Sequence, residues 1–491
     1  MRILDALQMQ KMDQYTIEEI GVPGKVLMEN AAKSWIEAAK PDLDNCNKIF
    51  LFCGAGNNGG DGYAIARNLS NQGYQCIVVA VKPPKSRDCL LNARVWTHFG
   101  KTLSWDEFIN LLPMTSKTDV LIDAIMGTGV ESEIRGTMVD VVKCVDQLSG
   151  QKIAVDIPTG ISASTGDKLG VAIRVNKCIT FHKEKVGHYL QPGKTYSGEL
   201  ICQKISIYEK YFDEDRHYYL TTKQVARELL LQREPNSYKN VFGHLLVWCG
   251  ATGTQGAAIL AASAAIRMGT GLVTAALPQT DDAFLITRSP ELMTCAQQSL
   301  TDSMLNNYQS IVLGCGLGRN KNRWKSIVNK IKKFEKPIVL DADAFFGIEH
   351  FYDLDPHKLV LTPHPGEFAQ LTGNPKPTNN LERIEQGLNF ISKYPTTLVL
   401  KGAPSIIFTS DHKVHINETG NAGMATAGSG DVLAGMIGGL LAQGLNTVDA
   451  AKLGVWLHGR SGDIFDNQYC QESLIATDLI SNIKNAFKEL Y

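Results

Sequence analysis

The chain has no dense run of lysine or arginine, no C-x-x-C pair and no uninterrupted apolar stretch near its start. Its 49 basic and 50 acidic side chains leave a formal net charge of −1, which argues against nucleic acid or an anionic membrane surface as the main partner. The 11 cysteines are scattered and odd in number, so they predict neither a disulfide framework nor a zinc site. Small molecules in a reducing compartment are therefore the expected partners.

The opening segment, MRILDALQMQKMDQ, places Asp5, Lys11 and Asp13 where an export signal needs an apolar run, so we expect a cytoplasmic protein. The longest apolar helical segments are interrupted by Arg267 or begin at Asp431. They therefore predict buried helices and not membrane spans.

With 491 residues, of which 44% are hydrophobic and 20% charged, the chain is long enough for two globular domains. Short apolar runs alternate with helix-like segments in both halves, which is the pattern of parallel α/β sheets. The charged and aromatic stretch YEKYFDEDRHYY at 208–219 interrupts this pattern and predicts a connector. We expect a doubly wound, Rossmann-like α/β domain at 1–213 and a second α/β domain at 223–491. The expected strands lie at 48–53, 75–81, 119–125, 152–158 and 177–182, then at 244–250, 272–277, 310–316, 337–343, 359–364 and 397–402, and helices are expected at 428–444, at 447–465 and from about 477.

A glycine-rich segment, GAGNNGGDG at 54–62, follows the first predicted strand and precedes the helix-like YAIARNL. Three of its glycines, Gly54, Gly56 and Gly59, match G-x-G-x-x-G in the strand–loop–helix context that binds dinucleotide phosphates. Glycine lets backbone N–H groups approach phosphate oxygens, and the helix N-terminus adds positive potential. The alternative is an ordinary tight turn. The next strand offers Lys82 where a ribose-binding acid is usual, which disfavours a simple hydride-transfer enzyme.

Two carboxylates follow later strands: Asp123 leads into a G-T-G loop and Asp156 into a P-T-G turn. Ligands bind at these strand ends in an open α/β sheet, and a carboxylate there serves as a general base. The oxygens of Asn58, Asp123 and Thr159 are also of the kind that hold a hard cation such as potassium. Alternatively, both Asp residues cap loops or helices.

These motifs resemble the NAD(P)H-hydrate epimerase family, whose pattern includes an N-N-G-G-D-G loop, an Asp before a G-T-G loop and a D-x-P-[ST]-G turn. The similarity extends over about residues 1 to 205. It implies that Asp156 is the catalytic acid/base and that Asn58, Asp123 and Thr159 hold K⁺. The hydrated dinucleotide would be bound by Asp156 together with Asn57, Asn58, Gly59, Gly60, Asp61, Gly127, Thr128, Gly129, Val130, Glu131, Ser132 and Glu133.

In the second half, NAGMATAGSGDVLAG at 421–435 places a glycine-rich loop before a helix that starts near Asp431. Backbone N–H groups of residues 428–430 predict an anion hole, and Asp431 beside it predicts a base for a hydroxyl group. The alternative is that Asp431 only caps the helix. His364 lies between prolines at a strand end, which favours a site over a structural histidine.

This segment resembles the ribokinase-like family and, more narrowly, its NAD(P)H-hydrate dehydratase branch, over about residues 223 to 491. The similarity also rests on SYKNVFGHLLVWCGATGTQGAAILAASAAIRMGTGLVT (237–274), VLDADA (339–344), TPHPGEF (362–368) and KGAPSII (401–407). It implies that Asp431 is the base of a reaction that uses ADP and Mg²⁺. The hydrated dinucleotide would be bound by Ala257, Gly316, His364 and Asp431, and the adenine nucleotide by Lys401, Gly402, Ala403, Pro404, Ser405 and Gly430.

The combined prediction is a bifunctional metabolite-repair enzyme, both isomerase and lyase. It would epimerise (R)- and (S)-NAD(P)H-hydrate and dehydrate the S form to NAD(P)H while ADP is converted to AMP and phosphate. The loop chemistry alone does not separate ADP from ATP. Two alternatives stay open: a kinase of a small hydroxylated metabolite with a regulatory N-terminal domain, and an N-terminal half that only binds nucleotide or serves as an oligomerisation scaffold. We also expect a homo-oligomer without nucleic-acid or membrane partners.

Overall fold

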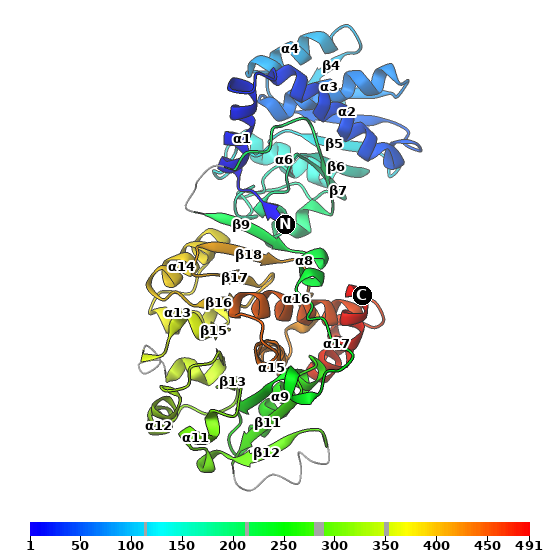
Figure 1. Ribbon diagram of the computed structural model, residues 1–491. Coiled ribbons are helices and arrows are strands. Elements are labelled where there is room, and N and C mark those ends of the chain that lie inside the picture. The colour runs from blue at the N-terminus through cyan, green and yellow to red at the C-terminus, as the bar shows by residue number, and fades with distance from the viewer. Residues whose placement is uncertain (112–114, 212–215, 279–288, 348–352) are drawn as a thin grey trace. The chain divides into compact units, whose positions relative to one another are not determined.

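A computed structural model describes residues 1–111, 115–211, 216–278, 289–347 and 353–491 (Figure 1). The chain forms two compact units, Ile3–Glu214 and Asp215–Tyr491, the second of which also includes Met1–Arg2. The limit expected for the first domain, residue 213, lies outside the described residues. Among the helices that the structure describes, none has both the length and the apolar character needed to cross a membrane.

The N-terminal unit is built on a seven-stranded parallel sheet in the order β4-β3-β2-β5-β6-β7-β8. In chain order this is the 3-2-1-4-5-6 arrangement of dinucleotide-binding folds with one strand added, which confirms the expected fold class. The order reverses at β2, and such folds bind their ligands at this point, beyond the carboxyl ends of the strands. The strands are β2 (Ile49–Cys53), β3 (Cys76–Ala80), β4 (Thr102–Ser104), β5 (Val120–Ala124), β6 (Gln151–Val155), β7 (Lys177–Phe181) and β8 (Glu199–Gln203).

Helices cover both faces of this sheet. Alternate side chains of β2 enter two separate cores: Leu51 packs with residues of α2 and α3, whereas Phe52 packs with residues of α5 and α6. A strand that is buried on both faces has a continuous apolar sequence, which is why β2, β3, β5, β6 and β7 were predicted correctly. The helices are α1 (Ala6–Glu18), α2 (Gly24–Leu43), α3 (Asn57–Asn71), α4 (Arg87–Trp96), α5 (Trp105–Leu111), α6 (Thr137–Gln147) and α7 (Gly193–Ser197).

The C-terminal unit contains an eleven-stranded sheet in the order β1-β9-β18-β17-β16-β15-β14-β13-β10-β11-β12. The strands from β12 to β16 are parallel, and β17 is antiparallel to both of its neighbours. Here the order reverses at β10, between β11 and β13. The strands are β1 (Arg2–Ile3), β9 (His217–Thr221), β10 (His244–Trp248), β11 (Leu272–Leu277), β12 (Met293–Ala296), β13 (Ser310–Leu313), β14 (Ile338–Leu340), β15 (Leu359–Leu361), β16 (Thr397–Leu400), β17 (Ile406–Phe408) and β18 (Lys413–Asn417).

Helix α15 of this unit packs closely on α9: a Cβ atom at position 435 would overlap the carbonyl oxygen of Ala261, so only glycine fits there. At the start of the same helix, Asp431 lies close to Cys315 after β13 and to Asp341 after β14. The three helices predicted at the end of the chain are confirmed as α15, α16 and α17. The helices of this unit are α8 (Lys223–Glu228), α9 (Gln255–Arg267), α11 (Asp302–Leu305), α12 (Lys321–Ile331), α13 (Pro365–Thr372), α14 (Asn380–Lys393), α15 (Ser429–Ala442), α16 (Thr447–Asp466) and α17 (Ala476–Leu490).

Two expectations about local structure are wrong in part. The stretch 208–219 is not wholly a connector, because its last residues begin β9, in which Tyr218 and Leu220 are buried and which pairs with β18. The partner strand is distant in sequence, so the local pattern did not reveal it; residues 212–215 lie outside the described residues. The glycine-rich segment 54–62 is loop only as far as Gly56, because α3 begins at Asn57.

Candidate active sites

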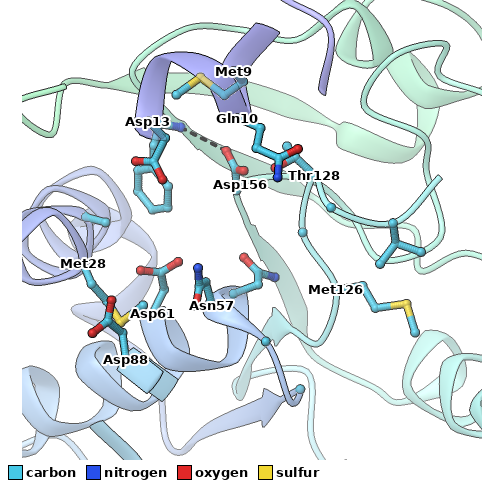
Figure 2. A pocket seen from close by; sticks show the side chains of 18 of the residues that line it. Met9, Gln10, Asp13, Met28, Asn57, Asp61, Asp88, Met126, Thr128 and Asp156 are labelled. Atoms are coloured by element: carbon cyan, nitrogen blue, oxygen red, sulfur yellow. Dashed lines mark hydrogen bonds between the residues drawn. The ribbon is translucent and has the colours of Figure 1, made fainter. Parts of the chain in front are cut away.

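A cavity of about 560 Å³ lies in the N-terminal unit beside the loops that follow β2, β5 and β6 (Figure 2). A cavity of this size suits a small-molecule ligand. Helix α1 and the N-terminal parts of α2 and α3 contribute further residues to its walls. Among the residues predicted to bind the hydrated dinucleotide, those that line it are Asn57, Asn58, Asp61, Gly127, Thr128, Gly129, Val130 and Asp156.

The remaining predicted binding residues of this unit lie outside the cavity lining; they are Gly59, Gly60, Glu131, Ser132 and Glu133. A Cβ atom at Gly59 would overlap the carbonyl oxygen of Gly54, so Gly59 allows α3 to pack on the preceding loop. Glu131 accepts hydrogen bonds from the hydroxyl groups of Ser162 and Ser164, which ties the loop after β5 to the loop after β6.

Two glycines of the loop after β2, Gly54 and Gly56, have different structural roles. A Cβ atom at Gly54 would overlap the carbonyl oxygen of Ile125, so Gly54 allows two loops to approach closely. Gly56 is the N-cap residue of α3 and lines the cavity, and a Cβ atom there would meet nothing within 4 Å. Gly56 therefore leaves open space in front of the α3 N-terminus, where backbone N–H groups and the helix dipole favour an anion.

Asp156 is held in place by several contacts after β6. Its φ of 69° is in the left-handed region that residues other than glycine seldom adopt, and such strained residues are common at functional sites. Its Oδ1 accepts hydrogen bonds from Lys185 Nζ at 2.5 Å and from Thr180 Oγ1 at 2.9 Å. Burial alone would raise the pKa of Asp156, but the Lys185 ammonium and these hydrogen bonds outweigh burial and hold the pKa below its usual value. Asp156 is therefore ionised.

Three further carboxyl groups face the same cavity: Asp13 on α1, Asp61 on α3 and Asp88 on α4. Burial raises the pKa of Asp61 well above its usual value. Burial and the neighbouring charge of Asp156 also raise the pKa of Asp13. Among the described residues, neither Asp13 nor Asp61 has a hydrogen-bond or ion-pair partner, so both are open to a ligand.

Two of the three residues predicted to hold potassium contact each other, and the third, Asn58, lies against Gly127 in the loop after β5. Thr159 donates hydrogen bonds to both carboxylate oxygens of Asp123, from Oγ1 at 2.7 Å and from its backbone N–H at 2.8 Å. Burial raises the pKa of Asp123 to about 6, so a nearby cation would favour its ionised form. The Asn58 side-chain nitrogen is buried and lacks a hydrogen-bond partner among the described residues. Because rotating this amide exchanges its nitrogen and oxygen, the donor set fits a hard cation such as K⁺.

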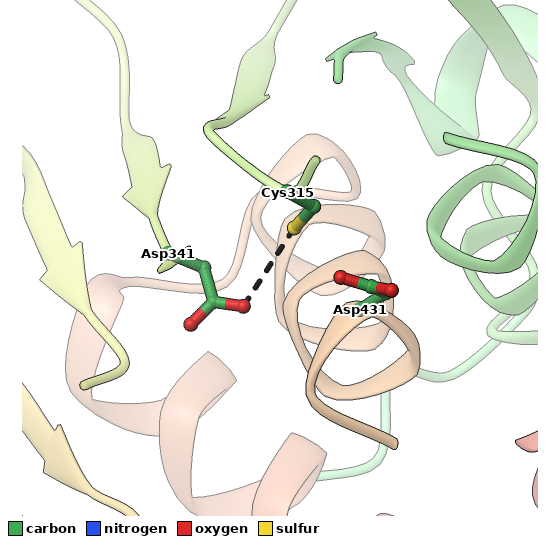
Figure 3. Close-up of side chains that lie close together, drawn as sticks. All are labelled: Cys315, Asp341 and Asp431. Atoms are coloured by element: carbon green, nitrogen blue, oxygen red, sulfur yellow. Dashed lines mark hydrogen bonds between the residues drawn. The ribbon is translucent and has the colours of Figure 1, made fainter. Parts of the chain in front are cut away.

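The second site lies where α15 begins. The N-cap of α15 is Gly428, with φ of 86° and no side-chain cap, so Asp431 in the first turn is not the capping residue. One side-chain atom each from Asp431, Asp341 and Cys315 lies within 4.8 Å of the other two (Figure 3). Burial first, and repulsion from Asp341 second, raise the pKa of Asp431 to about 6. Such a carboxylate takes up a proton near neutral pH, as a general base requires.

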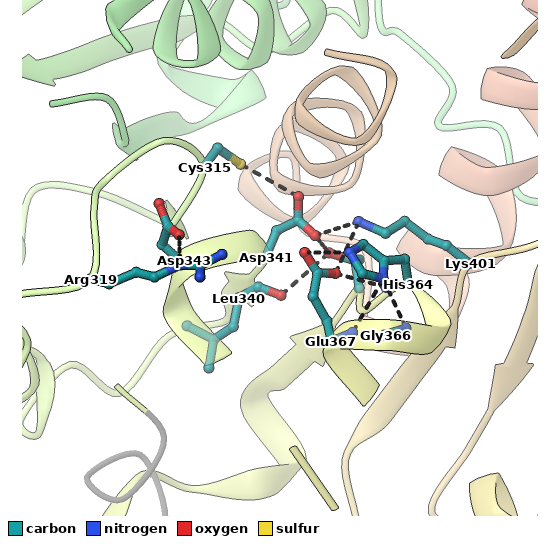
Figure 4. A network of polar contacts seen from close by, with 10 residues as sticks. Cys315, Arg319, Leu340, Asp341, Asp343, His364, Gly366, Glu367 and Lys401 are labelled. Atoms are coloured by element: carbon teal, nitrogen blue, oxygen red, sulfur yellow. Dashed lines mark hydrogen bonds and ion pairs between the residues drawn. The ribbon is translucent and has the colours of Figure 1, made fainter. Parts of the chain in front are cut away.

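A lysine connects this site to the predicted nucleotide-binding segment (Figure 4). Lys401 Nζ lies 2.8 Å from Asp341 Oδ1 and 3.8 Å from Glu367 Oε2. A Cβ atom at Gly430 would lie 3.2 Å from the same nitrogen, so the start of α15 leaves room for the lysine. Lys401 thus places a partly buried positive charge beside the carboxyl group that faces Asp431.

The thiol of Cys315 lies 3.6 Å from Asp341 Oδ2. Hydrogen bonding with Cys249, burial and the nearby acids raise the pKa of Cys315 well above its usual value. Cys315 therefore stays a thiol, and the two carboxyl groups are the oxygen ligands available for a cation such as Mg²⁺.

The other predicted binding residues of this unit surround the same strand ends. His364 is the N-cap residue of α13, and its Nδ1 accepts a hydrogen bond from the Gly366 N–H at 2.9 Å while its side chain stays 56% exposed. Gly316 lies against Ala257, since a Cβ atom at Gly316 would lie 3.1 Å from the Cβ of Ala257. The loop that contains Gly402, Ala403, Pro404 and Ser405 is held by Arg383, which donates hydrogen bonds to the carbonyl oxygens of Leu400 and Pro404.

Sequence reasoning missed several residues of the two sites. Neither Asp13 nor Lys185 lies in a motif, so the sequence pattern did not predict that they belong to a site. Asp341 was within reach, since it lies at a strand end inside the VLDADA segment. Arg383 gave no signal, because its partners are distant in sequence.

Models of two known families match the chain: residues 24–187 match the YjeF-related protein N-terminus, and residues 245–485 match NAD(P)H-hydrate dehydratase. A crystal structure of a ribokinase-like superfamily protein from Enterococcus faecalis is 27% identical, with a TM-score of 0.51, and the match covers 58% of this chain and 99% of that chain. An ADP/ATP-dependent NAD(P)H-hydrate dehydratase from Bacillus subtilis, crystallised with ATP/Mg²⁺, is 26% identical over 56% of this chain and 99% of that chain, with a TM-score of 0.49.

Relatives match over the whole chain. A protein from Moorella thermoacetica is 33% identical over 100% of this chain and 97% of its own length. A protein from Coxiella burnetii is 32% identical over 97% of each chain, and one from Escherichia coli is 30% identical over 93% of this chain and 88% of its own length. All three are described as bifunctional NAD(P)H-hydrate repair enzymes. The chain therefore belongs to the family of bifunctional NAD(P)H-hydrate repair enzymes.

Proposed function

We propose that this chain repairs hydrated NADH and NADPH in two linked steps. The N-terminal unit interconverts the R and S epimers, and the C-terminal unit removes water from the S epimer at the expense of ADP, with AMP and phosphate as the other products. One observation carries this proposal: each unit holds a largely buried aspartate with a shifted pKa close to the point where its sheet order reverses. These aspartates are Asp156, which is paired with Lys185, and Asp431, which faces Asp341.

In the N-terminal unit, the start of α3 behind Gly56 receives phosphate charge, and the hydrated ring lies near Asp156. The relatives' names describe the same substrate class. Asn58, Asp123 and Thr159 would hold K⁺, which supplies a fixed positive charge close to the loops that bind the dinucleotide.

In the C-terminal unit, the hydrated dinucleotide contacts Ala257, Gly316, His364 and Asp431, and the nucleotide lies between residues 401–405 and Gly430. Asp431 accepts the proton of the ring hydroxyl group, and the oxygen of that hydroxyl group attacks the terminal phosphoryl group of the nucleotide. Backbone N–H groups at the start of α15, together with Lys401, offset the charge that develops. Asp341 would hold Mg²⁺, which supplies further charge neutralisation, while Asp431 stays available as the base. Loss of phosphate and of a ring proton then restores the double bond of NAD(P)H.

The test is recovery of the dihydronicotinamide near-ultraviolet absorbance from a mixture of hydrated NADH epimers, with ADP, ATP or no nucleotide. Complete recovery with one nucleotide is expected, and it would identify the phosphoryl donor. Recovery that stops when the S epimer is exhausted would leave the N-terminal unit a binding module. A stable phosphorylated product without recovery would instead favour a kinase of a small metabolite.

A further inference from the structure

Epimerisation needs both a proton donor and a proton acceptor near the ring hydroxyl group, and Asp156 supplies only the acceptor. Its carboxylate is ionised because it lies 2.5 Å from Lys185 Nζ, and the Lys185 side chain is 1% exposed. Oδ1 of Asp156 also receives hydrogen bonds from Thr180 Oγ1 and from the Phe181 N–H. A carboxylate fixed in this way holds no proton to give to a departing hydroxyl group.

The cavity offers a second carboxyl group next to Asp156. Asp13 projects from α1 into the cavity that Asp156 also lines, and its carboxyl group has no hydrogen-bond or ion-pair partner among the described residues (Figure 2). The charged groups that face it come from four other elements: Asp156 after β6, Asp88 on α4, Asp61 on α3 and Lys185 after β7. Three of these four are acids, and Asp13 can keep a proton among them without breaking any contact.

We propose that Asp13 is a second catalytic residue of the epimerase, the acid that protonates the ring hydroxyl group, and that it shares one proton with Asp156. This proposal rests on the function proposed above. Two carboxyl groups placed together cannot both ionise readily, so one of them retains the proton. Lys185 decides which one, because its ammonium contacts Asp156. Burial and the charge of Asp156 raise the pKa of Asp13, in agreement with this assignment.

The reaction then proceeds in balanced steps. The Asp13 carboxyl group gives its proton to the ring hydroxyl oxygen, and the carbon–oxygen bond breaks with its electron pair on that oxygen, so that water departs. The lone pair of the ring nitrogen forms a carbon–nitrogen double bond, and the positive ring is stabilised by the nearby carboxylates. Water adds to the opposite face as those electrons return to nitrogen, and its surplus proton passes to Asp156 and from there to Asp13. Only the configuration at the ring carbon has changed.

Asp61 is the competing candidate for this role, because it also lines the cavity without a partner among the described residues. It extends from α3 beside Asn57, whereas Asp13 extends from α1. Burial raises its pKa well above the usual value, so Asp61 keeps its proton and serves as a hydrogen-bond donor to the ligand. This difference assigns proton transfer to Asp13 and ligand binding to Asp61.

The experiment measures the rate of R-to-S conversion by the full-length protein, with purified R epimer of hydrated NADH and chromatographic separation of the epimers. Asp13→Asn should lower kcat by about 10²- to 10⁴-fold, the usual contribution of general acid catalysis. The wild-type rate should fall as the pH rises through the raised pKa of Asp13, and the residual rate of the variant should lack this decline. Glu18→Gln is the matched control, because it removes the same charge from an exposed position on the same helix, and its rate should stay within about 2-fold of wild type.

A second variant covers the case in which Asp13→Asn perturbs folding. Asp13→Ala should regain activity in proportion to added formate, a small carboxylic acid that fits the vacated space. A rate within about 3-fold of wild type for Asp13→Asn would overturn the proposal, and so would an unchanged pH profile or a lack of formate rescue. A wild-type protein that dehydrates the S epimer but never converts the R epimer would instead refute the proposed function, before any variant is compared.

Discussion

The two sites use the same acid in opposite electrostatic settings. Asp156 in the N-terminal unit contacts a buried lysine, and its pKa lies below the usual value. Asp431 in the C-terminal unit faces another carboxyl group, and its pKa is raised to about 6. Burial raises the pKa in both cases, so burial alone does not explain the difference.

The position of the lysine decides the difference. Lys185 contacts Asp156 directly, whereas Lys401 lies 2.8 Å from Asp341, the neighbour of Asp431. The first lysine fixes a charged carboxylate, whereas the second pairs with an adjacent acid and leaves Asp431 free to exchange a proton near neutral pH. Two similar sheets therefore support different proton chemistry through one ion pair each.

Loss of the Asp431 carboxylate should produce the largest effect. Asp431→Asn removes the proposed base, so we expect dehydration of the S epimer to fall by about 10²- to 10⁴-fold while R-to-S conversion continues. Both rates can be followed in one preparation by near-ultraviolet absorbance and by separation of the epimers. Asp449→Asn is the control, because Asp449 lies in the first turn of α16 and not in the site, and dehydration should stay within about 2-fold of wild type. Similar losses in the two variants would show that a helix-terminal acid is needed only for stability.

Removal of the Lys185 ammonium group should have the second largest effect. Lys185→Met leaves Asp156 buried without its cation, which should destabilise the N-terminal unit by about 3–5 kcal/mol and raise the pKa of Asp156. The stability contributed by a depressed aspartate pKa is present above the unfolded value and is lost as the pH falls through the folded value. The free energy of unfolding of the wild type should therefore decrease as the pH falls below about 4, and the variant should lack this decrease. Denaturant unfolding at several pH values measures both. Equal stability of both proteins at neutral pH would contradict the assignment of Asp156 as an ionised partner.

Most of the fold followed from the sequence because buried parallel strands have continuous apolar sequences. β2 and β5 are buried throughout, and both were predicted. β4 is partly exposed, and β9 depends on a partner almost 200 residues away (His217 pairs with Lys413), so these two strands lack such a signal. The start of α3 was misplaced because its first residues include two glycines, which are poor helix formers.

The sites were predictable only where their residues follow a strand or begin a helix. Asp156 and Asp431 occupy such positions, and their roles stay predictions. Asp13 and Lys185 reach the cavity from a helix and a loop whose places depend on tertiary packing, so no local pattern marks them. The same limit applies to the opposite pKa shifts of the two aspartates, which depend on where each lysine lies.

Two glycine substitutions should separate packing from ligand binding in the N-terminal site. Gly54→Ala would force a Cβ atom against the Ile125 carbonyl oxygen and should destabilise the unit by about 1–3 kcal/mol. Gly56→Ala meets nothing within 4 Å at a φ of −93°, so stability should change by less than about 0.5 kcal/mol. Its methyl group faces the cavity, and KM for the R epimer should rise about 10-fold. Thermal unfolding and epimerisation kinetics measure the two effects, and a stability loss at Gly56 equal to that at Gly54 would contradict the separate roles.

The smallest expected effect concerns the pH dependence of dehydration. Asp341→Asn removes the carboxylate that repels the charged form of Asp431, so the pKa of Asp431 should fall below about 6. A general base must be deprotonated, and dehydration by the wild type should therefore decline as the pH falls through about 6. In the variant this acidic limb should move to lower pH by less than about one unit, because burial, the larger cause, remains. The profile of kcat/KM against pH for the S epimer measures the shift, and Asp302→Asn, which removes the same charge from an exposed position in the first turn of α11, is the control. If the acidic limb of the profile does not move, burial alone raises the pKa of Asp431. The difference in pKa between the two aspartates would then come only from the contact between Lys185 and Asp156.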